Sequence, residues 1–401
     1  MKKWLKPAWH KALSRFFEGD KNIKNEVIFI TIQTKEKSPQ VLAHSLASPL
    51  VSSSVRIEDD TTQNGFCQED VLVMCTTNTE LTQKFTPKKL TSEMLAQSYT
   101  RIGYQNKALR VADCGTFLEF AHEIQVDGVI AEKGKLHNAN FCKDRLCPMC
   151  SWRRSYKIFA QVSQIMEQIG SEYKFLFLTL TVPNCAPESL SETISRLMRS
   201  WNRLIDYKRF KKAIKGFFRA LEVTRNFSNG SYHPHFHCVL AVSKTYGNHL
   251  NYINHDEWLE MWRKAYQDSS ITQVDIRVAK GKNKEAENAV QELSSAVAEI
   301  AKYAVKSSDY IIDSDEALTD KIVQELNEAL YKRRLTAYGG CFKEAFEKLK
   351  LDDAEEGDLV HINETLNPAL AWLIVRYGWS CGAYQMTDSF IKYPDGKGDS
   401  E

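Results

Sequence analysis

The spacing of apolar residues predicts a run of helices and strands in the middle of the chain. Apolar side chains recur every three or four positions over 154–169, as in an amphipathic helix, and the apolar run FLFLTLTV over 175–182 follows as a buried strand. A second amphipathic helix is predicted over 187–204, where Pro stands at the first helical position. Two further strands, 219–226 and 233–242, flank a Ser-Asn-Gly turn and are predicted to pair as a hairpin.

The order of the remaining elements indicates the fold class. A helix over 255–267, a strand over 273–279 and a helix over 285–306 complete the patterned region. Helices and strands do not alternate strictly, as they would in a parallel sheet with crossover helices. We therefore expect an α+β protein with a central antiparallel β-sheet flanked by helices.

Length and composition bound the domain organisation. The 401 residues suffice for two or three domains, and 43% hydrophobic with 26% charged residues excludes a disordered or collagen-like chain. We predict a poorly defined N-terminal extension with a Ser/Thr-rich linker over 1–95, a cysteine-containing module over 96–155, a core over 156–340 and an acidic C-terminal segment over 341–401. No apolar run reaches the ~18 residues that span a bilayer, and charged residues interrupt the first positions, so we expect a cytoplasmic protein.

Charge is unevenly distributed, although the net charge is only +2. Between 196 and 219 nine basic residues stand against a single acid, and this stretch includes Arg209, Lys211 and Lys212. Such a stretch can contact the phosphate backbone of DNA, although a solvated helix face shows the same pattern.

Four of the ten cysteines are spaced like metal ligands. Cys147 and Cys150 are separated by two residues, and Cys142 lies five positions before the pair. Cys114 can lie beside them if the chain between Cys114 and Cys142 forms a hairpin. Four thiolates at one point suit tetrahedral Zn²⁺, so we predict a structural zinc in the module over 96–155. Buried small hydrophobic residues and a redox pair are the alternatives, and the redox pair lacks the βαβ setting that it needs.

Residues near this cluster add two expectations. His122 or His137 can take the place of the first cysteine as a zinc ligand. Arg153, Arg154 and Lys157 follow the last cysteine at a predicted helix start, where a metal-stiffened loop can present them to DNA phosphates.

Three histidines alternate along the predicted strand over 233–242. The period of a strand places His233, His235 and His237 on one face of the sheet. Glu222 on the preceding strand is the best candidate for an oxygen ligand beside His235 and His237. Mixed nitrogen and oxygen ligation suits Mg²⁺ or Mn²⁺ acting as a Lewis acid on a phosphodiester. A lone histidine is usually a surface or core residue, but two or three on one face are rarer.

The predicted helix over 285–306 carries a second reactive set. Its spacing places Glu299, Tyr303 and Lys306 in one stripe, opposite the apolar face. A phenol with a pKa near ~10 becomes a nucleophile when a cation stabilises its phenolate, as Lys306 can, and Glu299 can act as a base for the phenol or for water. An exposed helix face with an ordinary Glu–Lys ladder is the alternative.

Together these segments resemble the HUH endonucleases that initiate rolling-circle replication of small bacterial plasmids. The likeness rests on FLFLTLTVPN, on the His235-Phe236-His237 strand and on Tyr303 with Glu299 four residues before it, as in the single-tyrosine subgroup. The cysteine segment FCKDRLCPMC and the acidic LDDAEEGDLV are similar too, and the resemblance covers roughly 100–385.

The resemblance implies a function and its site. Tyr303 would attack the scissile phosphate of a single-stranded or hairpin origin and form a 5′-phosphotyrosine, with the metal held by His235, His237 and Glu222. Glu299 would activate water to end a round. The core over 156–340 would be the nicking and joining unit, preceded by a zinc-binding module with four cysteine ligands. Tyr310 lies seven residues beyond Tyr303, not four, so it does not fit the two-tyrosine pattern.

Partners and rival functions follow from the same comparison. No phosphate-loop motif is present, so strand separation would need a host helicase, and a host DNA polymerase would extend the free 3′-OH. A single-strand transposase of related type would share the chemistry and differ in its substrate. A non-catalytic zinc-dependent DNA-binding regulator would not depend on Tyr303, and a metal-dependent hydrolase would cleave without a covalent adduct.

Overall fold

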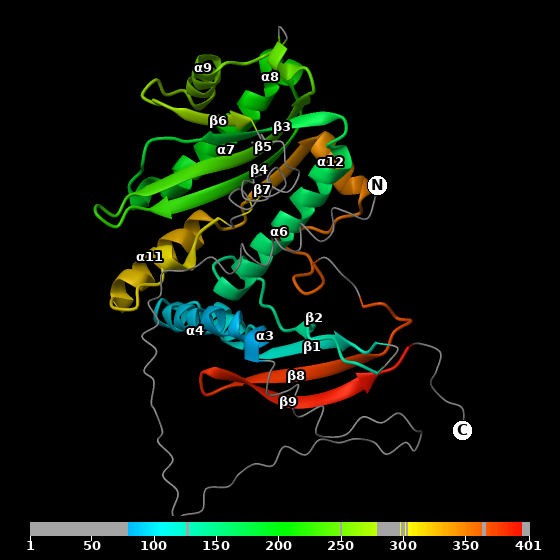
Figure 1. The fold of residues 1–401 in the computed structure, drawn as a ribbon. Helices are drawn as coiled ribbons and strands as arrows, with labels where there is room; N and C mark the ends of the chain where they lie inside the picture. The colour runs from blue at the N-terminus through cyan, green and yellow to red at the C-terminus, as the bar shows by residue number, and fades with distance from the viewer. Residues whose placement is uncertain are drawn as a thin grey trace, which may run out of the picture.

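The computed structural model describes most of the chain beyond its first 78 residues. The described residues are 79–125, 128–248, 251–278, 297, 301, 304–362 and 366–394. Their strands form two sheets in which every pairing is antiparallel. Helices flank the sheets, which confirms the predicted α+β class (Figure 1).

The larger sheet has five strands in the order β6-β3-β5-β4-β7. These strands are β3 (Tyr173–Leu180), β4 (Ile214–Arg225), β5 (Tyr232–Ser243), β6 (Val274–Val278) and β7 (Thr336–Gly340). β4 and β5 form the predicted hairpin, and Gly230 in the connecting turn has φ +73°, a conformation open to glycine without steric cost. β5 is therefore a central strand with partners on both sides.

Helices cover both faces of this sheet. They are α6 (Pro148–Ile169), α7 (Leu190–Asp206), α8 (Lys208–Ala213), α9 (His255–Tyr266), α11 (Glu316–Ala329) and α12 (Cys341–Lys348), with 3-10 turns at Pro187–Ser189, Tyr246–Asn248 and Ser307–Asp309. Trp201 of α7 packs against Phe236 of β5, with ring centroids 5.9 Å apart, on the face away from the histidines. On the other face Tyr338 of β7 packs between Phe218 and Phe346 of α12. One side of β5 is thus buried in the core, as its alternating pattern predicts.

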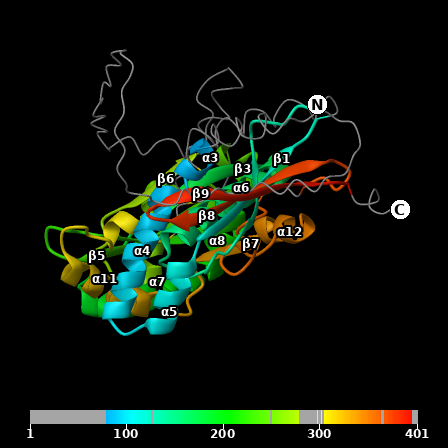
Figure 2. The ribbon, with the colours of Figure 1, turned by 90° about the horizontal axis from the view of Figure 1, so that it is seen from below.

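The smaller sheet joins two distant parts of the sequence. Its order is β2-β1-β8-β9, with β1 (Phe117–Glu123), β2 (Lys135–Ala139), β8 (Trp372–Ser380) and β9 (Ala383–Lys392). β8 and β9 belong to the predicted acidic C-terminal segment, yet β8 pairs along its length with β1 of the cysteine-containing module. Figure 2 shows the red strands β8 and β9 beside β1. The predicted domain boundaries remain a prediction, and this pairing describes how the two segments associate.

Helix α6 connects the two sheets. It begins at Pro148, directly after Cys147, and continues for 22 residues to Ile169 between the sheets (Figure 1). It contacts α12 and also α4 (Thr86–Arg101). Helix α4 follows α3 (Thr79–Gln83) and precedes α5 (Gln105–Asp113). Among the described helices, none combines the length and the apolar character that crossing a bilayer would require.

The predicted helix over 285–306 is described only at 297, 301 and 304–306. The N–H of Ala301 donates to the carbonyl of Val297 at 2.8 Å, as in an α-helix. Lys306 is extended, with φ −80° and ψ 142°, and the predicted helix end at 306 is therefore wrong. The reason is a competing partner, because the carbonyl of Ala304 accepts a hydrogen bond from Val223 of β4.

Candidate functional site

The hairpin register brings one acid and two histidines together on the larger sheet. Glu222 of β4 is paired with His235 of β5, and His237 follows on the same face. Glu222 Oε2 lies 2.9 Å from His237 Nε2 and 3.6 Å from His235 Nε2, and the two imidazole nitrogens are 3.1 Å apart. The three predicted ligands therefore converge, with one donor atom from each within 4.8 Å of the others. We call Glu222, His235 and His237 the carboxylate-histidine site.

Neighbouring groups orient the two imidazoles. His235 Nδ1 lies 3.0 Å from the carbonyl oxygen of His233, which only accepts, so Nδ1 carries a proton and Nε2 is the nitrogen that would bind a metal ion. His237 Nδ1 lies 3.3 Å from Oγ1 of Thr179 on β3. Both rings thus direct Nε2 toward Glu222. In metal-binding histidines the ring nitrogen that does not bind the metal typically makes a hydrogen bond to the protein, as both Nδ1 atoms do here. Sequence reasoning missed Thr179, since only the register of β3 against β5 pairs it with His237.

The third imidazole lies apart from the convergence point. His233 Nδ1 is 2.8 Å from Oδ1 of Asn184, and His233 is not among the residues whose donor atoms meet. Burial, together with the charge of His235, lowers the pKa of His233 below its ordinary value. His233 therefore contributes its backbone carbonyl to the site, and its ring stays neutral.

The carboxylate of Glu222 is buried but ionised. Glu222 is 6% exposed, and burial alone would raise its pKa, but hydrogen bonds and charge from His235 and His237 outweigh burial and hold the pKa of Glu222 below its ordinary value. Lys306 Nζ lies 4.0 Å from the other carboxylate oxygen, and the Lys306 side chain is 51% exposed. One oxygen and two nitrogen donors fit a divalent ion and leave coordination positions for a substrate.

Tyr303 and Glu299 lie outside the described residues. The next described residue after Tyr303 is Ala304, whose carbonyl accepts a 2.7 Å hydrogen bond from the N–H of Val223, the residue after Glu222. The backbone that follows Tyr303 is therefore held against β4 beside the carboxylate-histidine site. Tyr310 is 1% exposed, and burial raises its pKa far above the ordinary value, so its hydroxyl is not available as a second nucleophile.

The four predicted zinc ligands also converge. Cys114 Sγ lies 3.6 Å from Cys150 Sγ and 3.6 Å from Cys147 Sγ, and Cys142 Sγ lies 3.7 Å from Cys150 Sγ. A tetrahedral site with Zn–S bonds of ~2.3 Å has sulfur–sulfur separations of about 3.8 Å, which these distances approach. They are far longer than a disulfide bond of ~2.05 Å, and the four residues are free cysteines. We call these four residues the cysteine cluster.

Backbone N–H groups turn toward the sulfurs of this cluster. Lys143 N lies 3.2 Å from Cys150 Sγ, Asp144 N lies 3.4 Å from Cys142 Sγ, and Cys142 N lies 3.4 Å from Cys114 Sγ. Such donors favour charged thiolates. The cluster could therefore hold a metal ion without a histidine.

The two histidines considered as replacements lie outside this set. His122 is fully buried, with Nδ1 3.0 Å from the carbonyl of Ala131, and burial lowers its pKa. His137 stacks edge-on with His361, with ring centroids 6.0 Å apart. Cys114 occupies the fourth position, so neither histidine is needed as a ligand.

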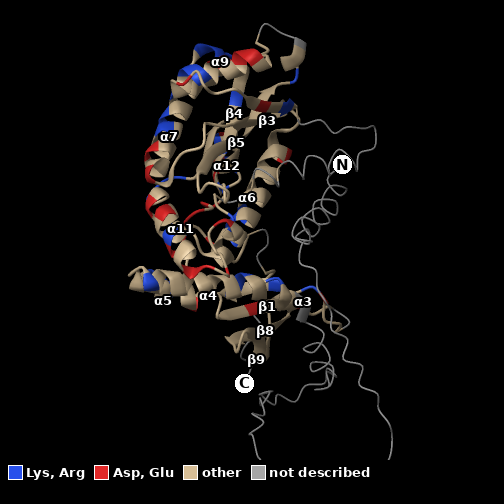
Figure 3. Ribbon diagram, turned by 90° about the vertical axis from the view of Figure 1, so that its left-hand side faces the viewer, with Lys and Arg blue, Asp and Glu red and all other residues tan. Residues whose placement is uncertain are grey.

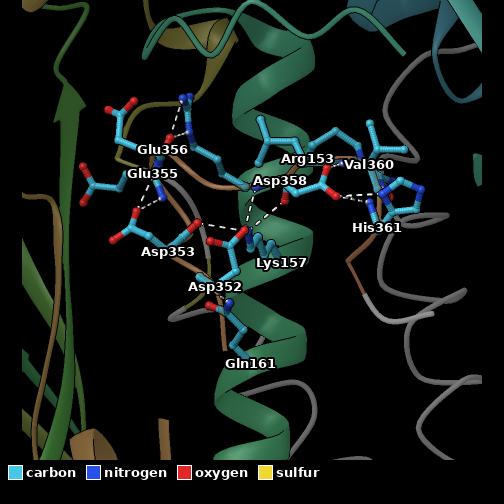
Figure 4. Close-up of polar contacts among 12 residues, drawn as sticks. Arg153, Lys157, Gln161, Asp352, Asp353, Glu355, Glu356, Asp358, Val360 and His361 are labelled. Atoms are coloured by element: carbon cyan, nitrogen blue, oxygen red, sulfur yellow. Dashed lines mark hydrogen bonds and ion pairs between the residues drawn. The ribbon is translucent and has the colours of Figure 1, made fainter. Parts of the chain in front are cut away.

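The expectation that Arg153, Arg154 and Lys157 contact DNA is corrected by their burial. These side chains of α6 are 8%, 1% and 3% exposed. Lys157 Nζ donates to Asp352 Oδ2 at 2.7 Å and to two backbone carbonyls, and Arg153 donates to the carbonyls of Leu359 and Val360 (Figure 4). Arg154 donates to the carbonyls of Asp144 and Glu355, so the donors of all three side chains are used within the protein and are not available to phosphates.

The basic residues predicted to contact DNA in the stretch over 196–219 differ in exposure: Arg209 is paired within the protein, and Lys211 and Lys212 lie on the surface. Arg209 donates to the carbonyl of Tyr252 and lies 3.2 Å from Glu257, so it ties α8 to the start of α9. Lys211 and Lys212 are exposed, and Lys211 lies 2.9 Å from the exposed Asp206. Figure 3 shows Lys and Arg along α7 and again at α9. Lys211 and Lys212 remain candidates for backbone contacts with DNA.

Comparison with known proteins shows that the chain is a protein of DNA replication. A family model described as "Replication protein" matches residues 133–382, a range that includes the carboxylate-histidine site and three of the four clustered cysteines. The chain belongs to this family of replication proteins. The predicted recognition as a plasmid replication initiator is confirmed at this level, and binding of origin DNA is implied by it.

Several relatives carry the same designation. "Protein rep" of Bacillus amyloliquefaciens is 40% identical over 294 residues, which cover 69% of this chain and 85% of the relative. "Protein rep" of a Bacillus species is 41% identical over 299 residues, or 72% and 95% of the two chains. "Protein rep" of Streptococcus pneumoniae serotype 2 strain D39 is 38% identical over 283 residues, or 69% and 83%. No solved structure matches.

The burial of Lys157 predicts an effect on stability. We expect Lys157→Met to lower the free energy of unfolding by about 2–3 kcal/mol, because hydrogen bonds to charged groups contribute ~1.5–3 kcal/mol. Lys212→Met, on the exposed surface, should change it by less than about 0.5 kcal/mol and should instead weaken DNA binding and its salt dependence. Urea unfolding and DNA titrations at several salt concentrations measure both. If Lys157→Met bound DNA more weakly with unchanged stability, the result would contradict the structural role of Lys157 and support its predicted contact with DNA phosphates.

The geometry of the cysteine cluster predicts a bound metal. We expect purified protein to contain about one zinc per chain, and Cys147→Ser to lose it together with thermal stability, because Cys147 is fully buried among the other sulfurs. Cys238→Ser is the control, since Cys238 is equally buried but lies in β5 outside the cluster. Elemental analysis distinguishes the two. Full zinc content in Cys147→Ser would contradict the assignment.

Proposed function

We propose that this chain nicks one strand of its plasmid origin by tyrosine transesterification, as an HUH endonuclease of the single-tyrosine subgroup. The observation that carries the proposal is the convergence of Glu222, His235 and His237 beside the backbone that follows Tyr303. Membership in the replication protein family supports origin DNA as the substrate.

The carboxylate-histidine site holds Mg²⁺ or Mn²⁺ in this proposal. Oxygen and imidazole donors are accepted by both ions, and the ion when bound polarises the scissile phosphodiester. The chain supplies the orientation: the His233 carbonyl and the Thr179 hydroxyl keep both Nε2 atoms directed at one point. Lys306 adds a positive charge on the exposed side of Glu222.

Tyr303 acts as the nucleophile. Its phenolic oxygen forms a bond to the scissile phosphorus while the bond from phosphorus to the 3′ oxygen breaks. The phenol proton passes to a base, and the leaving 3′ oxygen takes up a proton to become a free 3′-OH. The product ester, a 5′-phosphotyrosine, keeps the energy of the phosphodiester, so the strand can be rejoined later. Lys306 can stabilise the phenolate, because a phenol with an ordinary pKa of ~10 is otherwise protonated at neutral pH.

Glu299 serves as the base and also ends the reaction. Four residues before Tyr303, it would take the proton of the phenol in the nicking step. In the final step it would take a proton from water, which attacks the phosphorus and releases the tyrosine and a 5′-phosphate. One tyrosine then suffices, which agrees with the inaccessible hydroxyl of Tyr310.

The remaining parts of the chain bind rather than react. The cysteine cluster holds structural Zn²⁺, and Lys211 and Lys212 contact the phosphate backbone of the origin. A host helicase separates the strands and a host polymerase extends the 3′-OH, so the reaction takes place in the cytoplasm beside the replicating plasmid.

The nucleophile predicts a covalent adduct. Wild-type protein mixed with Mn²⁺ and labelled single-stranded origin DNA should give a denaturation-resistant protein–DNA adduct, which Tyr303→Phe lacks. Tyr331→Phe is the control, because Tyr331 is exposed and remote in sequence. Gel electrophoresis under denaturing conditions reads the result. Cleavage without an adduct would favour a hydrolase, and DNA binding without cleavage in both proteins would favour a regulator.

The hydroxyl of Thr179 predicts an effect on metal affinity. Thr179→Val should weaken Mn²⁺ binding by about 10- to 100-fold, because the loss of a hydrogen bond to a ligating imidazole has effects of this size. Thr179→Ser retains the hydroxyl and should bind almost as wild type does. Electron paramagnetic resonance of free Mn²⁺ measures the affinity without DNA. Equal affinities of the Val and Ser variants would exclude an orienting role for Thr179.

A further inference from the structure

Tyr310 connects the backbone beside the carboxylate-histidine site to the cysteine cluster. Its ring is 1% exposed, and its hydroxyl donates to the carbonyl of Leu146, the residue before Cys147. It lies four residues after Lys306, whose side chain faces Glu222. The two proposed metal sites are therefore linked through a single short segment, 304–310.

This segment is held firmly at both ends. At one end the carbonyl of Ala304 accepts from Val223 at 2.7 Å, and Ala304 is 1% exposed. Within the segment the N–H of Asp309 donates to the carbonyl of Lys306, and just beyond it the N–H of Ile311 donates to the carbonyl of Ser307, both at 2.9 Å. At the other end stands Tyr310. These hydrogen bonds form a compact turn at 306–311, and we expect a shift at Tyr310 to reach Ala304 through it.

The loop that receives the Tyr310 hydroxyl is in turn fixed by the cysteine cluster. Leu146 N donates to Asp144 Oδ1 at 3.0 Å, and Asp144 N points at Cys142 Sγ at 3.4 Å. Tyr99 of α4 also donates to Asp144 Oδ1, at 3.0 Å. Two buried tyrosines thus bind the same loop, but only Tyr310 belongs to the segment that continues from Tyr303.

We propose that Tyr310 is a positioning residue for the nicking reaction: it anchors the segment 304–310 to the cysteine-cluster loop, so that a filled cysteine cluster is required for correct placement of Tyr303 and Lys306. This inference rests on the proposed nicking function. Small displacements of reacting groups have large effects on rate, so loss of the anchor should act on the covalent step more than on DNA binding.

The test compares Tyr310→Phe with Tyr99→Phe in the full-length protein. Each change removes one buried hydroxyl that binds the loop and keeps the aromatic ring. At saturating single-stranded origin DNA and Mn²⁺, we expect Tyr310→Phe to form the covalent adduct at least about tenfold more slowly, with unchanged DNA affinity and zinc content. Tyr99→Phe should remain within about twofold of wild type. Equal adduct rates in the two variants would overturn the inference.

Hydrogen exchange separates this inference from the nicking proposal. The amide of Val223 is protected by Ala304, so a peptide covering β4 should exchange faster in Tyr310→Phe, and in wild type stripped of zinc, than in Tyr99→Phe. Unchanged exchange in both would overturn the anchoring role even if nicking occurs. If the β4 peptide exchanged faster in Tyr310→Phe but the wild type formed no adduct, the nicking proposal would be rejected and the anchoring role of Tyr310 would stand.

Discussion

The pairing of β4 with β5 is the constraint on which the site depends. Side chains alternate along a strand, so a slip of one residue would move Glu222 to the opposite face and separate it from His235 and His237. Glu222 would then be a buried charge without partners, which costs several kcal/mol. Phe236, packed on Trp201 across the sheet, resists the same slip from the other side. The packing of Phe236 on one face of the sheet therefore helps to fix which side chains meet on the opposite face.

A second constraint connects the cysteine cluster to the larger sheet through buried polar groups. Arg154, almost fully buried, donates to the carbonyls of Asp144 near the cysteine cluster and of Glu355 in the acidic segment. Glu355 in turn accepts from the N–H groups of Leu335 and Thr336 at the start of β7. Such groups are tolerated in the interior because each has its partners, and they tie the cysteine cluster to the larger sheet. The acidic segment thus acts as a structural connection between the cysteine cluster and the larger sheet.

The sequence was informative where a pattern is local. The alternation of His235 and His237, and the spacing of the clustered cysteines, follow from short-range geometry, and the structure brings both sets together. Contacts between distant segments left no such signal. The burial of Lys157 depends on residues 352–358, and β1 pairs with a strand that begins at Trp372. The end of the helix before Lys306 depends likewise on a hydrogen bond from Val223.

The central proposal is that Tyr303 carries the DNA covalently. The most direct measurement is protease digestion of the wild-type adduct, followed by mass spectrometry of the peptide that retains nucleotides. The account predicts a nucleotide 5′-phosphate esterified to Tyr303, in a peptide that also contains Glu299 or Lys306. Attachment to any other residue, or cleaved DNA with no modified peptide, would contradict it.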